Sequence, residues 1–235
     1  ITQPNQLLSA MSQQNVLCFG QSTGKAWVTM SGGAGGYQYS WTGGGTPTGN
    51  GDTIINLAAD TYIVTVTDDN NCVAVDSVTI TQPQLLTLTK DSLNVLCFGD
   101  STGKAWVTIG GGTPGYNNVV WTGGGTPSGP LNDTLNNIPA GTYTASVTDT
   151  NGCTATTSAT ITDNPALTVT LDQVIDVTCN GLSNGTIFVN VAGGVPTYTF
   201  AWSGPNNYTA STQNISGLAA GAYNVTVTDA NNCTG

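Results

Sequence analysis

The side chains that could do chemistry in this 235-residue chain are of few kinds. All 13 acidic residues are aspartate, the three basic residues are Lys25, Lys90 and Lys104, and histidine is absent. Histidine is the commonest general base and metal ligand, and no other nucleophile and base form a pair, so we predict no enzyme and no cofactor. A net charge of −10 without arginine also argues against nucleic acid as a partner, because phosphate binding needs a basic face.

The six cysteines recur at matching places about 80 residues apart, which indicates three tandem repeats. We define repeat 1 as residues 5–82, repeat 2 as residues 83–164 and repeat 3 as residues 165–235. Residues 1–4 have the sequence Ile-Thr-Gln-Pro, which recurs in residues 80–83, where repeat 1 ends. We therefore expect residues 1–4 to be the tail of a preceding repeat and the chain to be part of a longer array. Each repeat has a first cysteine (Cys18, Cys97, Cys179) and a second cysteine (Cys72, Cys153, Cys233).

Matching cysteines predict one internal disulfide in each domain: Cys18–Cys72, Cys97–Cys153 and Cys179–Cys233. Repeat symmetry also permits a cross-repeat set, such as Cys72–Cys97. Closing a loop of about 55 residues should stabilise so small a domain by about 4 kcal/mol. A metal site is the competing interpretation, but no CxxC spacing accompanies the cysteines. Stable disulfides need an oxidising compartment, so we expect a secreted protein.

The most regular strand pattern lies just before each second cysteine. In residues 142–148 the side chains of Tyr143, Ala145 and Val147 alternate with threonine and serine, which predicts a half-buried strand. Threonine, valine, glycine, asparagine and serine dominate the chain, while the helix-favouring glutamate and arginine are absent, so we predict an all-β fold. Gly141, at the corner before this strand, and Gly221, its counterpart in repeat 3, are expected to need a positive φ.

The corner tyrosine and one tryptophan per repeat point to a particular all-β fold. The tyrosine resembles the tyrosine corner of immunoglobulin-like sandwiches, and Trp41, Trp121 and Trp202 would anchor their cores. We therefore predict tandem immunoglobulin-like β-sandwich domains with one disulfide per domain. Repeat 3 stops before the last strand that repeats 1 and 2 have at residues 73–80 and 154–161. Its open sheet edge should be filled by the chain's own continuation or by another protomer's strand.

An aromatic residue occurs in the strand that follows each first cysteine. Ala26 and Val28 would face the core, so Trp27 would point outward, as would Trp106 in repeat 2 and Phe188 in repeat 3. Displayed rings of this kind can contact glycans or a neighbouring chain. The alternative is that a loop or the first segment of the repeat covers them.

The Asp-x-Asn sequences before the second cysteines are weak candidates for a calcium site. A full calcium loop needs six or more oxygen ligands, and these sequences supply few. Aspartate and asparagine are also the ordinary residues of tight hairpins, so we predict turns and no bound metal. The candidate residues are Asp68, Asn70, Asp149, Asn151, Asp229 and Asn231.

Several short motifs occur in the same order in each repeat. Cys-Phe-Gly or Cys-x-Gly is followed by Ser-Thr-Gly or Ser-Asn-Gly, a Gly-Gly turn and a strand from tyrosine to tryptophan. Pro-Ala-Gly-Thr-Tyr, Val-Thr-Asp-x-Asn-Gly-Cys and Ile-Thr-Gln-Pro complete the series. This combination resembles the SprB-type repeat of gliding-bacterium surface adhesins. The resemblance implies a very large repetitive protein, exported by type IX secretion and displayed as filaments used in adhesion or gliding motility.

The same resemblance implies O-glycosylation in triplets of aspartate, serine or threonine, and an aliphatic residue or threonine. We predict a structural spacer of a long extracellular adhesin or filament at the cell surface. Its partners would be other copies or the continuation of the chain, with surface polysaccharide as a further one. The alternative is a glycan- or partner-binding module that uses the displayed aromatic residues. No membrane insertion is expected, because no apolar run reaches the length of a membrane span. The candidate glycosylation residues are Thr53, Ser77, Ser92, Ser101 and Thr134.

Overall fold

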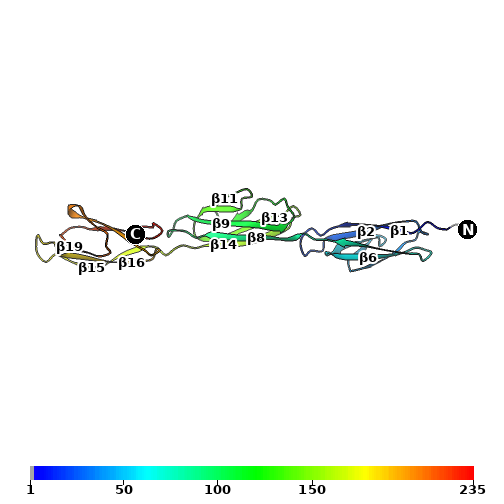
Figure 1. The fold of residues 1–235 in the computed structure, drawn as a ribbon, viewed down its shortest axis with the longest axis horizontal. Helices are drawn as coiled ribbons and strands as arrows, with labels where there is room; N and C mark the ends of the chain where they lie inside the picture. The colour runs from blue at the N-terminus through cyan, green and yellow to red at the C-terminus, as the bar shows by residue number, and fades with distance from the viewer. Residues whose placement is uncertain (1–2) are drawn as a thin grey trace. The chain divides into compact units, whose positions relative to one another are not determined.

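The computed structural model describes residues 3–235, and it is built from β-strands that follow one another through the three repeats (Figure 1). Repeat 1 contains seven strands, which the alternation of buried and exposed side chains favours. The strands are β1 (Leu8–Gln14), β2 (Gly24–Ser31), β3 (Gln38–Thr42), β4 (Thr46–Thr48), β5 (Thr53–Leu57), β6 (Asp60–Thr67) and β7 (Val73–Ile80).

The strands of repeat 1 form the two sheets of an immunoglobulin constant-type sandwich. One sheet has the order β1-β2-β5-β4 and the other has the order β3-β6-β7. All neighbouring strands are antiparallel. These sheets correspond to the A-B-E-D and C-F-G sheets of that fold, which confirms the predicted fold class.

Repeat 2 has the same strand order. Its sheets are β11-β12-β9-β8 and β10-β13-β14. The strands are β8 (Gln84–Leu93), β9 (Gly103–Gly112), β10 (Val120–Thr122), β11 (Thr126–Ser128), β12 (Thr134–Ile138), β13 (Gly141–Thr148) and β14 (Thr154–Ile161).

Repeat 3 differs at its fourth strand and at its last strand. The fourth strand pairs with the third, so the sheets are β15-β16-β19 and β18-β17-β20. Within the described residues only a bridge between Thr228 and Thr234 lies where a last strand would begin. The elements are β15 (Thr168–Ile175), β16 (Gly185–Ala192), β17 (Thr199–Gly204), the 3-10 turn η1 (Pro205–Asn207), β18 (Tyr208–Ala210), β19 (Ile215–Leu218) and β20 (Asn224–Thr228).

The hydrophobic core of each repeat lies between its two sheets. In repeat 1, Ala26, Ile54 and Leu57 of one sheet pack against Tyr62 and Ile80 of the other. The corresponding cluster of repeat 2 is equally buried, and repeat 3 has a smaller one. Their buried members are Ala105, Leu135, Ile138, Tyr143 and Ile161 in repeat 2, and Val189, Trp202, Ile215 and Leu218 in repeat 3.

The corner tyrosines make the hydrogen bond that defines a tyrosine corner. The hydroxyls of Tyr62, Tyr143 and Tyr223 each donate to the backbone carbonyl four residues upstream, at 3.1, 2.9 and 3.0 Å. The tryptophan of the third strand is also anchored through its indole N–H. Trp202 donates to a backbone carbonyl at 2.9 Å, and the tryptophans of repeats 1 and 2 do the same.

The prediction of a positive φ at the corner is wrong for Gly141, whereas Gly221 has a φ of 157°. Gly141 opens β13 with an ordinary backbone. The left-handed residues are instead Asn56 (φ 61°), Asn137 (φ 53°) and Gly217 (φ 70°). A β-bulge explains these conformations, since the register between β12 and β9 shifts immediately before Ile138.

The described chain divides into two compact units, and the division passes through the strands of repeat 2. Unit 1 joins repeat 1 to one end of repeat 2, and unit 2 joins the rest of repeat 2 to repeat 3. Unit 1 is Ile1–Thr89, Thr108–Val120 and Ser146–Thr157, and unit 2 is Lys90–Val107, Trp121–Ala145 and Ser158–Gly235. The boundaries of the three predicted domains therefore stay a prediction.

Between residues 3 and 235, no helix has both the length and the apolar character needed to cross a bilayer.

Candidate functional site: the disulfide junctions

Three buried aspartates stand at the ends of β6, β13 and β20. Asp68, Asp149 and Asp229 expose only 4, 3 and 5% of their surface. In repeat 2, Oδ1 of Asp149 accepts the backbone N–H of Asn151 and of Cys153, both at 2.9 Å, and Oδ2 accepts the N–H of Thr113 at 2.8 Å. The same three bonds surround Asp68 and Asp229. Each aspartate thus ties the hairpin that carries the second cysteine to the loop after β2, β9 or β16.

Backbone donors keep these carboxylates charged. The N–H of Ala34 is the largest influence on the pKa of Asp68 and lowers it, and the N–H of Val195 does the same for the pKa of Asp229. Burial is the largest influence on Asp149 and opposes the charge, but its three backbone hydrogen bonds together still hold its pKa below the ordinary value. A carboxylate that accepts several N–H groups is stabilised in its ionised form.

Glycines in the facing loops allow the aspartates to approach the backbone. Gly33 and Gly112 adopt φ of 62° and 64°, which side-chain-bearing residues rarely do. A Cβ at these positions would lie 2.7 and 2.9 Å from Oδ2 of Asp68 and Asp149. The Gly-Gly turns therefore allow the aspartate contacts that hold the cysteine hairpins in place.

The proposed calcium ligands lie in these hairpins but do not converge. Both oxygens of Asp68, Asp149 and Asp229 already face backbone N–H donors, which compete with a cation for the lone pairs. In the part of the chain that the structure describes, no three acidic, cysteine or histidine side chains are grouped as a metal site. The Asp-x-Asn sequences act here as hairpin turns.

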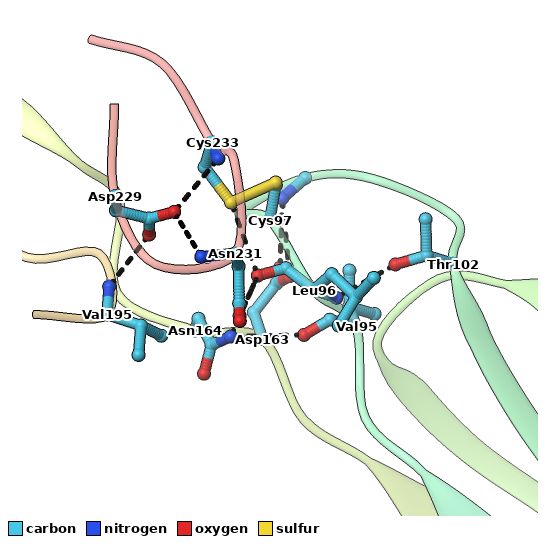
Figure 2. The surroundings of a disulfide bond; sticks show 11 residues. Val95, Leu96, Cys97, Thr102, Asp163, Asn164, Val195, Asp229, Asn231 and Cys233 are labelled. Atoms are coloured by element: carbon cyan, nitrogen blue, oxygen red, sulfur yellow. Dashed lines mark hydrogen bonds between the residues drawn. A yellow bond between two sulfur atoms is a disulfide. The ribbon is translucent and has the colours of Figure 1, made fainter. Parts of the chain in front are cut away.

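Each first cysteine begins a tight turn. The carbonyl of Cys97 accepts the N–H of Asp100 at 3.1 Å. The N–H of Leu96 donates to Oγ1 of Thr102 at 2.8 Å (Figure 2). The turns at Cys18 and Cys179 have the same pair of bonds, with an asparagine in place of the threonine in repeat 3. The first cysteine is therefore presented by the same local structure in all three repeats.

Two disulfides join a first-cysteine turn to the second-cysteine hairpin of the next repeat. Cys18 is bonded to Cys153 and Cys97 to Cys233, with Cα–Cα distances of 5.7 and 5.5 Å. Figure 2 shows the second of these bonds. The predicted pairs Cys18–Cys72, Cys97–Cys153 and Cys179–Cys233 are wrong, and so is one disulfide per domain. The pairing belongs to the cross-repeat class, although its partners differ from Cys72–Cys97.

The two cysteines of a repeat cannot meet because they lie at opposite ends of its sandwich. Cys18 precedes β2, whose first residue pairs with the last residue of β5. Cys72 follows β6, whose end lies at the far end of β2, where Asp68 binds the loop of Ala34. Five strands, an odd number, separate the cysteines, and an eight-residue strand spans about 26 Å. A disulfide needs Cα atoms within about 7 Å.

An asparagine adds a polar contact beside each disulfide. Nδ2 of Asn151 donates to the carbonyl of Leu17 at 2.9 Å, and Nδ2 of Asn231 donates to the carbonyl of Leu96 at 3.1 Å (Figure 2). These carbonyls also lie 3.4 Å from the Sγ atom of the second cysteine. Sequence reasoning missed this role, since it considered the two asparagines only as hairpin residues and as weak candidates for calcium ligands. Their fixed place two residues before the second cysteine was the available signal.

Open clefts border both disulfides. A cleft of about 220 Å³ beside Cys18 and Cys153 is lined by Phe19 and Leu85 among others, and one of about 310 Å³ beside the second disulfide is lined by Phe98. All four bonded cysteines line these clefts and are half-buried.

The remaining two cysteines are unpaired. Cys72 is the second cysteine of repeat 1 and Cys179 is the first cysteine of repeat 3, and both are exposed. We had expected both in disulfides within their repeats. Within the described residues, no first-cysteine turn faces Cys72 and no second-cysteine hairpin faces Cys179.

The strand-B aromatics, one each in β2, β9 and β16, lie on the outer face of their sheets; they are Trp27, Trp106 and Phe188. Ala26 and Val28 are buried, whereas Trp27 is half-buried, and Nζ of Lys25 lies 5.2 Å from the centroid of its ring. Lys104 and Trp106 repeat this contact at 5.3 Å, and Phe188 is also half-buried. Whether these rings bind a ligand stays a prediction.

The predicted glycosylation residues fall into two groups. Ser77 and Ser101 are exposed, and Ser92 is half-buried. The hydroxyls of Thr53 and Thr134 donate to the preceding aspartate at 2.9 Å, so these two threonines are already engaged. Their modification also stays a prediction.

Comparison with known proteins supports the repeat assignment. The SprB repeat family model matches residues 10–46 and 171–207, together about a third of the chain. Three N-terminal domains of the bacteriophage RB49 Highly Immunogenic Outer Capsid protein are 16% identical over 89% of this chain and 80% of that chain, with a TM-score of 0.42. The N-terminal eight immunoglobulin domains of Down Syndrome Cell Adhesion Molecule are 14% identical, with a TM-score of 0.37, and this chain covers 38% of that one.

These structural likenesses are too low to bear on function, and the strand order alone carries the fold assignment. Among curated proteins, none matches this chain. The two family matches fall on the first-cysteine regions of repeats 1 and 3, where the quoted motifs begin. The predicted resemblance is confirmed, because these two regions match the SprB repeat model.

Proposed function

We propose that the chain is a structural spacer of a long extracellular adhesin or filament, and that its disulfides limit how far it extends under tension. One observation carries the proposal. A first cysteine is bonded to the second cysteine of the next repeat, twice, with the same asparagine contact each time. A bond of this kind ties consecutive repeats to each other as well as closing a loop.

The pairing shortens the covalent path that tension follows. From the first residue the path reaches Cys18, crosses to Cys153, returns along the chain to Cys97 and crosses to Cys233. About 78 of the 235 residues lie on it. At about 3.5 Å per extended residue, the oxidised chain can reach roughly 270 Å, against roughly 820 Å when both disulfides are reduced.

The disulfides also stabilise the folded repeats. They join residues 135 and 136 positions apart. In the chain-entropy model, closing a loop of that length disfavours the unfolded chain by about 5 kcal/mol. The two loops share residues 97–153, so their contributions are not additive.

The proposed setting is the cell surface. Structural disulfides persist in oxidising environments, and the SprB resemblance implies export by type IX secretion to a surface where adhesion or gliding motility takes place. Other copies or the continuation of the chain would be the partners in a filament. We propose no catalytic role, because no nucleophile is paired with a base in the disulfide junctions.

A second candidate function is binding of surface polysaccharide by the strand-B aromatics. The observation in its favour is the matched placement of a lysine over Trp27 and over Trp106 on an outer sheet face. Aromatic rings with one accessible face stack on sugars. The double variant Trp27→Ala, Trp106→Ala should lose polysaccharide binding that the parent shows, and unchanged binding would remove this candidate.

Glycosylation belongs to the same proposed setting. Ser77 and Ser101 are the preferred acceptors because their hydroxyls are exposed. Intact-mass measurement of native material should show hexose-containing additions, and the bare polypeptide mass would exclude the modification.

The spacer proposal is tested by stretching single molecules held at their two ends. The oxidised parent should extend to roughly 270 Å and the reduced parent to roughly 820 Å. Pairing within each repeat would give nearly the same oxidised length, so two variants separate the alternatives. Cys153→Ser should lengthen the oxidised chain to roughly 350 Å, since the path then runs from the first residue to Cys97 before it crosses. Cys72→Ser should leave the length unchanged, and a longer Cys72→Ser chain would contradict the proposal.

A further inference from the structure

We propose that Cys72 and Cys179 are the two halves of a third junction, formed between two copies of this chain. Cys179 of one copy would bond to Cys72 of the next, so copies would join head to tail. The inference rests on the proposed spacer function and deepens it by naming the partner, a second copy of the chain. Its chemistry follows from the two junctions already described.

The half that carries Cys72 is built like the bonded halves. Oδ1 of Asp68 accepts the N–H of Asn70 at 2.9 Å and of Cys72 at 2.8 Å, as Asp149 does for Asn151 and Cys153. The hairpin that presents the sulfur therefore has the shape that bonds in both other repeats. What differs is the surroundings of the hairpin.

The half that carries Cys179 is likewise preformed. The carbonyl of Cys179 accepts the N–H of Leu182 at 3.2 Å, and the N–H of Thr178 donates to Oδ1 of Asn184 at 3.1 Å. These are the bonds that hold the turns of Cys18 and Cys97. The carbonyl of Thr178 occupies the place of the carbonyls that accept an asparagine Nδ2 in the bonded junctions.

Exposure distinguishes the open halves from the closed ones. Asn70 and Cys72 are exposed, whereas their counterparts in repeats 2 and 3 are half-buried by the facing turn. The half-buried counterparts are Asn151, Cys153, Asn231 and Cys233. A turn of the type that carries Cys179 is what covers these groups in both closed junctions.

Complementarity selects the head-to-tail arrangement. One half supplies the Nδ2 donor of Asn70, and the other supplies the carbonyl acceptor of Thr178. Two copies joined through Cys72 of each would bring two hairpins together without an acceptor turn. The interface is therefore heterologous, and it leaves one open half at each end of the product for further copies.

The covalent step is a thiol–disulfide exchange with a small disulfide as the oxidant. The thiolate of Cys179 attacks one sulfur of glutathione disulfide, which forms a mixed disulfide and releases one glutathione thiolate. The thiolate of Cys72 from a second copy then attacks the Cys179 sulfur and releases the second glutathione. Two protein thiols are oxidised to one protein disulfide, one glutathione disulfide is reduced to two glutathione thiols, and the two protons lost by the protein thiols are taken up by the released glutathione thiolates.

The test incubates the full chain with a mixture of oxidised and reduced glutathione at 0.15 M salt or above, where repulsion between copies of net charge −10 is screened. Non-reducing electrophoresis should show a ladder of dimers, trimers and longer products. Cys72→Ser alone and Cys179→Ser alone should stay monomeric. A mixture of these two variants should give a dimer and nothing longer, because each supplies one half.

Peptide mapping of the dimer should find Cys72 linked to Cys179. Asn70→Ala, with both thiols intact, should lower the yield of the ladder at equilibrium about fivefold, the effect of one hydrogen bond. The same digest shows whether the Cys18–Cys153 and Cys97–Cys233 links are present. If they are present and no ladder forms, the proposed function still stands and only this inference fails. A monomeric parent, dimers from either single variant, or a Cys72–Cys72 linkage would overturn the inference.

Discussion

Asn151 donates from its Nδ2 to the carbonyl of Leu17 at 2.9 Å, one residue before the cysteine to which Cys153 is bonded. The polar contact and the disulfide therefore hold the same two segments together. The contact needs no oxidation, so it can align the turn and the hairpin before the sulfur atoms react. The recurrence of this arrangement at Asn231 and Leu96 indicates a repeated mode of joining successive repeats.

Replacing Asn151 by alanine should weaken the first disulfide without removing it. The lost hydrogen bond should shift the equilibrium between this disulfide and glutathione about fivefold towards the reduced form. Asn151 also donates to Oγ1 of Thr113, so Thr113→Val is the matched control that removes only that second contact. Quantitative alkylation in redox buffers measures both variants, and an equal effect of the two would contradict the role given to the Leu17 contact.

Removing a disulfide should lower stability as well as lengthen the chain. The double variant Cys18→Ser, Cys153→Ser should lose about 5 kcal/mol or less of unfolding free energy, since the second disulfide still constrains part of the same loop. Denaturant titration followed by tryptophan fluorescence measures the loss. Cys72→Ser is the control and should unfold like the parent. Destabilisation by Cys72→Ser equal to that of the double variant would indicate that Cys72 is bonded in the parent.

The buried aspartates predict a stability that falls in acid. The pKa values of Asp68, Asp149 and Asp229 are lower in the folded chain than in the unfolded chain. Their contribution is therefore fully present above the unfolded pKa, near pH 4, and is lost as the pH falls through the lower folded pKa. Melting temperatures measured from pH 7 downward should fall across that window.

Asp149→Asn separates this effect from general acid unfolding. The amide offers only one acceptor oxygen, so the melting temperature of the variant at pH 7 should be lower than that of the parent. Because the amide does not titrate, this melting temperature should also fall less than that of the parent as the pH is lowered below 4. Asp172→Asn, at an exposed position, is the control and should behave like the parent. A parent and an Asp149→Asn variant with parallel pH profiles would refute the assignment.

The open edge of repeat 3 predicts that a strand added from outside will bind there. A Cβ at Gly24 would lie 2.8 Å from Cγ2 of Ile80, and Gly103 stands in the same way beside Ile161. At Gly185 the nearest atoms to a Cβ belong to Leu218 and to the backbone of Ile175, with no isoleucine side chain among them, and a cavity of about 160 Å³ borders this glycine. A last strand fills this place in repeats 1 and 2.

A synthetic peptide with the sequence of residues 154–161 should therefore bind repeat 3 and slow amide exchange in β20. The peptide with alanine in place of its isoleucine should bind at least tenfold more weakly, because a buried isoleucine side chain contributes about 2 kcal/mol or more. A peptide of scrambled sequence is the control. Equal binding of the parent and alanine peptides would show that the cavity is not the isoleucine site.

Much of the fold could be predicted because the relevant signals are local. The alternation of Tyr143, Ala145 and Val147 fixes which face of β13 is buried, and all three are buried in the structure. The corner tyrosine and the Gly-Gly turns mark where strands end. Such patterns determine a strand from its own residues, so they can be read without knowing the rest of the chain.

The disulfide pairing could not be predicted in the same way, because it depends on the number of strands between two cysteines. The sequence suggests that Cys18 and Cys72 belong together, since they recur as a pair. The short strand β4, which pairs with β5, brings the number of strands between these cysteines to five, and this odd number places them at opposite ends of the sandwich. The roles of Asn151 and Asn231 were missed for the same reason, since their partners lie more than 130 residues away.

The most direct test is peptide mapping of the oxidised protein, digested without reduction after free thiols are blocked at low pH. The account predicts linked peptides that contain Cys18 with Cys153 and Cys97 with Cys233, and alkylated Cys72 and Cys179 in the monomer. Linked peptides that contain Cys18 with Cys72 would contradict it.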